Sequence, residues 1–107
     1  MKTIKNIDKK LMNLIGKPLF LDDEGKIEAQ VNDLVASSLL QQKQSKDPVR
    51  SLKLAFKFKD SAGLLELEDA DFDLARASIT ENTNLTNLIA GQVLEVLDAA
   101  EKKEGTK

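Results

Sequence analysis

Five carboxylates lie close together in the second half of the chain and are its best candidates for chemistry. They are Glu66, Glu68, Asp69, Asp71 and Asp73. A pair of such groups can do acid–base catalysis when a pocket raises the pKa of one of them. These carboxylates also stand where a helix is expected to begin, and acidic side chains favour the positive end of the helix dipole. We therefore expect a solvated helix start rather than an active site.

The same segment resembles the first part of a calcium-binding EF-hand loop. Asp69, Asp71 and Asp73 match its first three ligand positions. However, Leu74 stands where the turn requires glycine, and Thr80 stands where the loop requires a bidentate glutamate. Both replacements disable the loop, so we expect no metal site.

The chain contains no histidine and no cysteine. These absences remove the commonest general base, thiolate nucleophiles, disulfides and the usual ligands of transition metals. The 5 glycines are scattered and form no phosphate-binding loop. We therefore expect a protein that is not an enzyme and that uses no cofactor.

Length and composition predict one small globular domain. The chain has 107 residues, of which 41% are hydrophobic and 32% are charged, and its net charge is −2. We expect a single domain at 1–102 and a flexible tail at 103–107. The negative charge disfavours general attraction to nucleic acid. No segment has the pattern of an export signal or of a membrane span, so we expect a cytoplasmic protein without a membrane partner.

Apolar spacing predicts a mostly helical α+β fold, with an N-terminal strand or hairpin followed by three to four helices packed on one aliphatic core. Residues 1–21 are expected to form a strand or a short irregular arm, and Asp22 to Gly25 a turn. A helix is expected from Ile27 to Gln42, followed by a polar loop to Lys46. Its apolar face consists of Ile27, Val31, Leu34, Val35, Leu39 and Leu40.

The segment that follows Asp47 and Pro48 fits two structures. Val49, Leu52, Ala55 and Phe56 form a helical stripe, whereas alternating apolar residues and lysines between 52 and 59 resemble a strand that could pair with 65–67. Asp47 suits a helix N-cap and Pro48 the first helical position. This capped start favours the helix.

Two further helices are expected in the second half of the chain. After an extended link at 64–67, Glu68 and Asp69 should begin a helix that buries Phe72, Ala75 and Ile79 and breaks at 82–84. The last helix is expected from about Thr86 to Lys102. Its apolar side consists of Leu85, Ile89, Val93, Val96, Leu97 and Ala100.

Some apolar residues lie outside these predicted buried faces and are candidates for contact with a partner. Leu54, Phe58, Leu74 and Leu94 lie off the main stripes, which predicts protein binding or a homo-oligomer. Gly91 is predicted within a helix, where glycine costs about 1 kcal/mol relative to alanine, so it is expected to mark a close approach. That approach could be a helix crossing within the domain or a contact with a partner.

Lysines also form a small basic stripe. Lys53, Lys57 and Lys59, with Arg50, could contact an acidic partner or a phosphate, although a solvated face is the simpler expectation. The stripe keeps open an alternative function as a small nucleic-acid-binding regulator.

The order of several segments resembles small proteins encoded by tailed phages and prophages. The segments that carry this resemblance are 16–19, 34–40, 51–57, 65–72 and 92–97. Most such proteins have no assigned activity, so the resemblance implies an accessory role and transfers no functional residue. We expect a non-enzymatic protein that binds a phage structural protein or a host protein, in virion or tail assembly or in modulation of the host. The resemblance places it in the host cytoplasm or with the virion.

Overall fold

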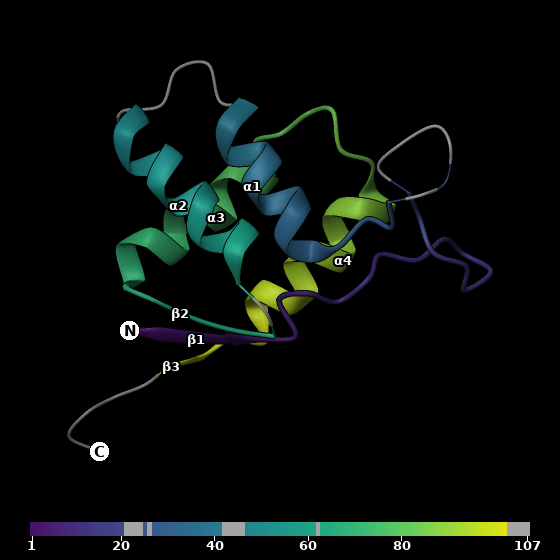
Figure 1. The fold of residues 1–107 in the computed structure, drawn as a ribbon, viewed down its shortest axis with the longest axis horizontal. Coiled ribbons are helices and arrows are strands. Elements are labelled where there is room, and N and C mark those ends of the chain that lie inside the picture. Colours follow the sequence, from purple (N-terminus) through teal and green to yellow (C-terminus); the bar gives the residue numbers. More distant parts are fainter. Residues whose placement is uncertain (21–24, 26, 42–46, 62, 103–107) are drawn as a thin grey trace.

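The computed structural model describes residues 1–20, 25, 27–41, 47–61 and 63–102. Within these ranges the chain forms four helices and three strands. The helices are α1 (Val31–Gln41), α2 (Pro48–Asp60), α3 (Asp69–Thr80) and α4 (Asn87–Asp98), and the strands are β1 (Lys2–Lys5), β2 (Leu64–Leu67) and β3 (Glu101–Lys102). The predicted mostly helical α+β fold is confirmed, and the helices stack above a small sheet (Figure 1).

The sheet has the order β2-β1-β3, with both pairs antiparallel. Lys2 is opposite Leu67 on one side and Lys102 on the other. The expected N-terminal strand is therefore confirmed, and its partners come from distant parts of the sequence. The alternative that 52–59 is a strand paired with 65–67 is wrong, because α2 occupies those residues and β2 pairs with β1.

One aliphatic core joins the helices to the sheet. Ile4 of β1 and Leu67 of β2 are buried with residues from every helix, and Phe58 is the largest of the fully buried side chains. The predicted stripe of α3 is confirmed, since Phe72, Ala75 and Ile79 are all buried. Helix α1 packs most extensively against α2 and also against α3.

A polar contact reinforces the junction of α1 and α2. Asn32 is 4% exposed, and its side-chain amide donates to the carbonyl of Phe58 at 3.2 Å. Its own side-chain oxygen is buried and accepts no hydrogen bond from the residues that the structure describes. A buried acceptor without a donor costs about 1–3 kcal/mol. Asn32 therefore fixes the contact between α1 and α2 but lowers the stability of the domain at the same time.

Two element boundaries differ from the sequence prediction. Helix α1 begins at Val31 rather than Ile27, because residues 28 to 30 make backbone bridges to the N-terminal arm. Helix α4 ends at Asp98 rather than Lys102, because Glu101 and Lys102 pair with β1 as β3. The predictions for the turn at 22–24, the loop at 42–46 and the tail at 103–107 lie outside the described residues.

The N-terminal arm reverses direction in a tight turn at residues 13–17, and the residue before this turn is tied to α4. The side-chain oxygen of Asn13 accepts hydrogen bonds from the backbone N–H groups of Ile15 and Lys17, both at 3.0 Å. The side chain of Gln92 accepts from the N–H of Met12 and donates to its carbonyl. The turn exposes Leu14 at 92% and Ile15 at 75%.

Helices α3 and α4 are joined at the surface by an ion pair. The guanidinium of Arg76 donates to Asp98 at 2.8 Å. That hydrogen bond lowers the pKa of Asp98 below its ordinary value. Both side chains are well exposed, so the pair adds little to stability near neutral pH.

Candidate functional site

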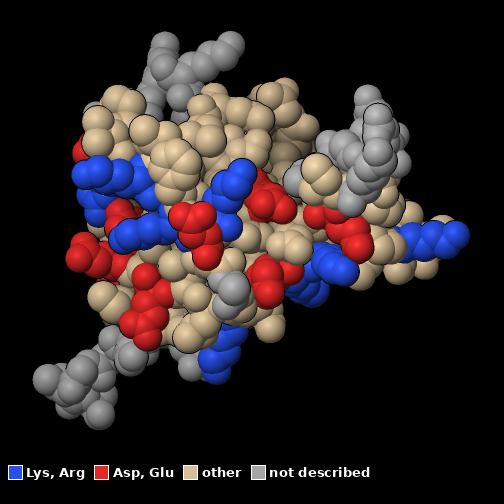
Figure 2. All heavy atoms as spheres, in the orientation of Figure 1, with Lys and Arg blue, Asp and Glu red and all other residues tan. Residues whose placement is uncertain are grey.

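Helix α2 carries apolar residues on two opposite faces. Ser51, Leu54, Ala55 and Phe58 are buried against the core. Val49, Leu52 and Phe56, spaced for one helical face, are on the other side and are 60%, 45% and 53% exposed. We refer to these three residues as the α2 ridge. Figure 2 shows a largely uncharged surface above rows of charged side chains in the region of α1 and α2.

Local sequence fixes the position of this ridge. The carboxylate of Asp47 accepts from the N–H of Arg50 at 3.0 Å, and Pro48 is at the first helical position, as the sequence predicted. At the other end, the hydroxyl of Ser61 donates to the carbonyl of Lys57 at 2.5 Å. Because both ends are capped and Phe58 is in the core, the ridge is held in place without a partner.

A row of cations runs along the same helix. Arg50, Lys53 and Lys57 are three and four residues apart, so their side chains share one side of α2. Arg50 donates to Asp71 of α3 at 2.6 Å, and this hydrogen bond raises the pKa of Arg50. Lys53 and Lys57 form no ion pair within the described part of the chain.

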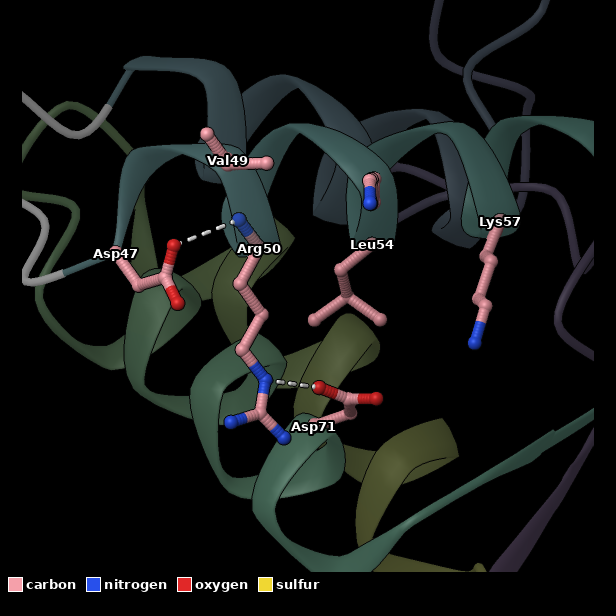
Figure 3. Close-up of a pocket in the computed structure, with 7 residues that line it drawn as sticks. Asp47, Val49, Arg50, Leu54, Lys57 and Asp71 are labelled. Atoms are coloured by element: carbon pink, nitrogen blue, oxygen red, sulfur yellow. Dashed lines mark hydrogen bonds and ion pairs between the residues drawn. The ribbon is translucent and has the colours of Figure 1, made fainter.

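Between α2 and α3 the surface is hollowed next to this row. The hollow has a volume of about 340 Å³. It is lined by Asp47, Val49, Arg50, Lys53, Leu54, Lys57 and Asp71. In Figure 3, Arg50 and Lys57 extend to the same side of the helix with Leu54 between them, and Asp71 approaches from α3 to meet Arg50. We call this feature the α2–α3 hollow.

The carboxylate cluster of the sequence lies in β2, at the N-cap of α3 and in the first two turns of α3. Asp71 pairs with Arg50, and Asp69 lies 3.3 Å from the N-terminal amino group. Glu66, Glu68 and Asp73 are exposed. The residues that the structure describes contain no group of three potential metal ligands.

No family model, curated protein or solved structure matches this chain. A function must therefore be argued from its own surfaces. Among the described helices, none is both long enough and apolar enough to cross a bilayer.

The structure corrects part of the predicted partner surface. Leu54 is 2% exposed and Phe58 is fully buried, so the prediction that they are surplus to the core is wrong. The physical reason is that the opposite face of α2, with Val49, Leu52 and Phe56, is the one left in solvent. Leu74 and Leu94 are half-buried and pack against the core, and their contact with a partner stays a prediction.

Gly91 is exposed on α4, and a Cβ atom added there would lie more than 4 Å from every described atom beyond its chain neighbours and the backbone of its own helix. The predicted helix crossing at this position is therefore wrong, while a contact with a partner stays a prediction. The basic stripe is also divided, because Lys59 does not share the side of α2 that carries Lys53 and Lys57.

Gly91→Ala is expected to stabilise the domain by about 0.5–1 kcal/mol, because alanine has the higher helix propensity and the site has room for a methyl group. Urea denaturation followed by circular dichroism measures the change. A lower unfolding midpoint for Gly91→Ala would contradict the open environment of this position.

Proposed function

We propose that this chain is a non-enzymatic binding protein whose protein partner covers the α2 ridge. The single observation that carries the proposal is the exposure of Val49, Leu52 and Phe56 on a helix whose opposite face is completely buried. A row of three apolar side chains on a rigid helix is a common way to dock on another protein.

The size of the ridge suits the centre of an interface. Covering a fully exposed Val, Leu or Phe contributes about 1.5–3 kcal/mol, and each ridge side chain still has roughly half of that to gain. Apolar anchors near the middle of an interface usually carry most of the affinity, with polar residues around them. The cations of α2 would belong to that polar border.

A protein partner fits this surface better than nucleic acid. Of the four cations in the basic stripe, Arg50 is already paired with Asp71, and Lys59 is on a different side of the helix. The remaining two lysines are a small electrostatic footprint on a chain with a net charge of −2. Nucleic-acid regulation therefore stays the weaker alternative.

The biological setting follows from the resemblance to small phage proteins. We propose an accessory role in the host cytoplasm or on the virion, in assembly or in modulation of a host protein. The α2 ridge supports the binding part of this proposal, and the resemblance alone supports the phage setting.

The absence of cysteine allows a site-specific test. We would place one cysteine at Leu52, attach a photo-activated crosslinker and irradiate the protein in extracts of the cells that encode it. Matched labels at Leu14 and Glu95 report on an exposed apolar site and an exposed polar site elsewhere. The expected result is one discrete protein adduct from position 52 that is weaker from both control positions.

Loss of the same adduct when Phe56→Ser is added to the labelled protein would connect it to the ridge. Equal adducts from all three positions, or none from position 52, would overturn the proposal. An adduct from Leu14 alone would assign binding to the turn of the N-terminal arm instead.

A further inference from the structure

We propose that the α2–α3 hollow binds a carboxylate side chain of an acidic segment in the partner that covers the α2 ridge. This inference rests on the proposed function and names the chemistry of the partner. It begins with the charges that line the hollow, which are three cations and two carboxylates.

Both carboxylates are already occupied within the chain. Asp47 accepts a hydrogen bond from the backbone of Arg50, and Asp71 accepts one from the Arg50 guanidinium. Arg50 and Asp71 therefore neutralise each other, and Lys53, Lys57 and Asp47 leave the hollow with a net charge of +1, carried by the two lysines.

These two lysines repel each other in the free protein. They are four residues apart on one helix, where like charges destabilise a helix slightly. Three other cations of the described chain have partners: Lys10 pairs with Glu28 and Arg76 with Asp98, while Lys2 lies over the ring of Phe72. An anion between Lys53 and Lys57 would remove the repulsion and form charge-assisted hydrogen bonds.

The walls of the hollow favour a carboxylate on an aliphatic stem. Leu54 and Val49 contribute apolar surface beside the cations. A glutamate or aspartate can place the aliphatic part of its side chain against Leu54 while its oxygens reach the lysines. Figure 3 shows Leu54 between Arg50 and Lys57. Val49 belongs to both the hollow and the ridge, so one peptide with neighbouring acidic and apolar residues can reach both.

A second copy of this chain is a poor occupant. In a two-fold dimer whose axis passes through the lysine row, the row of one copy would approach that of the other. Like charges across an interface cost affinity. The surface is therefore complementary to an acidic partner of a different kind.

The experiment is a selection of random 16-residue peptides displayed against the full-length protein. We expect the selected peptides to be enriched in Asp and Glu beside Leu, Ile or Phe, and their binding to weaken as salt is raised. For the best peptide, fluorescence anisotropy should give a Kd that increases at least about tenfold in Lys53→Glu/Lys57→Glu, a change worth about 1.4 kcal/mol.

The control is Lys9→Glu/Lys17→Glu, which makes the same change in net charge at exposed positions outside the hollow. It should leave the Kd within about twofold. Lys53→Ala/Lys57→Ala should weaken binding less than the charge reversal, and melting curves show whether each variant is folded. The lysines are exposed, so we expect all of them to fold.

Selected peptides without acidic enrichment, or equal affinity for the wild type and Lys53→Glu/Lys57→Glu, would overturn the inference. Retardation of a short DNA duplex by the wild type but not by the charge-reversal variant, with no acidic peptides selected, would assign the lysines to nucleic acid. Neither result bears on whether a protein is crosslinked at position 52. The crosslinking experiment therefore tests the proposed function independently of this inference.

Discussion

Phe58→Ala is expected to lower the free energy of unfolding by about 3–5 kcal/mol. Phe58 is fully buried and is the largest side chain among those without exposure, so its truncation leaves a cavity between α2 and the rest of the core. Domains of this size have about 5–15 kcal/mol of stability, and the loss would be a large part of it. Chemical denaturation of both proteins, with a shared slope, measures the difference.

Phe56→Ala is a matched control for this prediction. It removes the same side chain from the same helix, two residues away, at a residue that is 53% exposed. We expect a loss below about 1 kcal/mol, because about half of the residue is already in water and its truncation leaves no enclosed cavity. Similar losses for the two variants would show that the buried and exposed faces of α2 are wrongly assigned.

Asn32→Asp is expected to destabilise the domain by about 3 kcal/mol or more at neutral pH. The change is nearly isosteric, but it replaces the amide that donates to the carbonyl of Phe58 with a carboxylate. Two oxygens would then face each other in a site that is 4% exposed and that already holds an oxygen without a donor. Thermal unfolding at pH 7 detects the loss.

The pH dependence of Asn32→Asp separates charge burial from a loss of packing. Burial without a partner raises the pKa of a carboxyl in the folded state. The loss of unfolding free energy is therefore greatest at pH values well above that raised pKa. It decreases as the pH falls toward the ordinary aspartate pKa of about 3.9. The difference in stability between the variant and the wild type should therefore become smaller in acid. A difference that does not change with pH would contradict charge burial as the cause.

Asn32→Leu is the uncharged control for Asn32→Asp. Leucine removes both the donor and the unpaired oxygen, and the carbonyl of Phe58 keeps a hydrogen bond from the N–H of Ser61 at 3.3 Å. We expect a change within about 1.5 kcal/mol and no narrowing in acid.

The sequence predicted the helices well where local signals were strong. The Asp47-Pro48 start and the spacing of Phe72, Ala75 and Ile79 identify α2 and α3 without tertiary information. The partners of β1 could not be predicted, because strand pairing depends on segments that are about 60 and 100 residues away. The end of α4 was missed for the same reason, since β3 forms only on β1.

The candidate site could be predicted only in part. The sequence identifies the cations of α2, but its stripe pattern predicts that the ridge is in the core and that Leu54 and Phe58 face a partner, which is the reverse of the structure. The distribution of charge around α2 distinguishes its two faces. At about 100° per residue, the five charged residues of α2 lie in the same half of the helix as Val49, Leu52 and Phe56. The charge-free half with Leu54 and Phe58 is the buried one. The hollow itself depends on Asp71 approaching Arg50 from α3, which no local pattern specifies.

The central place of β1 in the sheet has a consequence for biosynthesis. Lys2–Lys5 are synthesised before both of their neighbours in the sheet, β2 and β3, and β3 follows about 100 residues later. Until β2 and then β3 are synthesised, the corresponding edge of β1 lacks its partner strand, whereas α1 and α2 can already pack together. Strand β1 is therefore among the last elements of the fold to complete its hydrogen bonding, and a stalled nascent chain would expose it to chaperones or proteases.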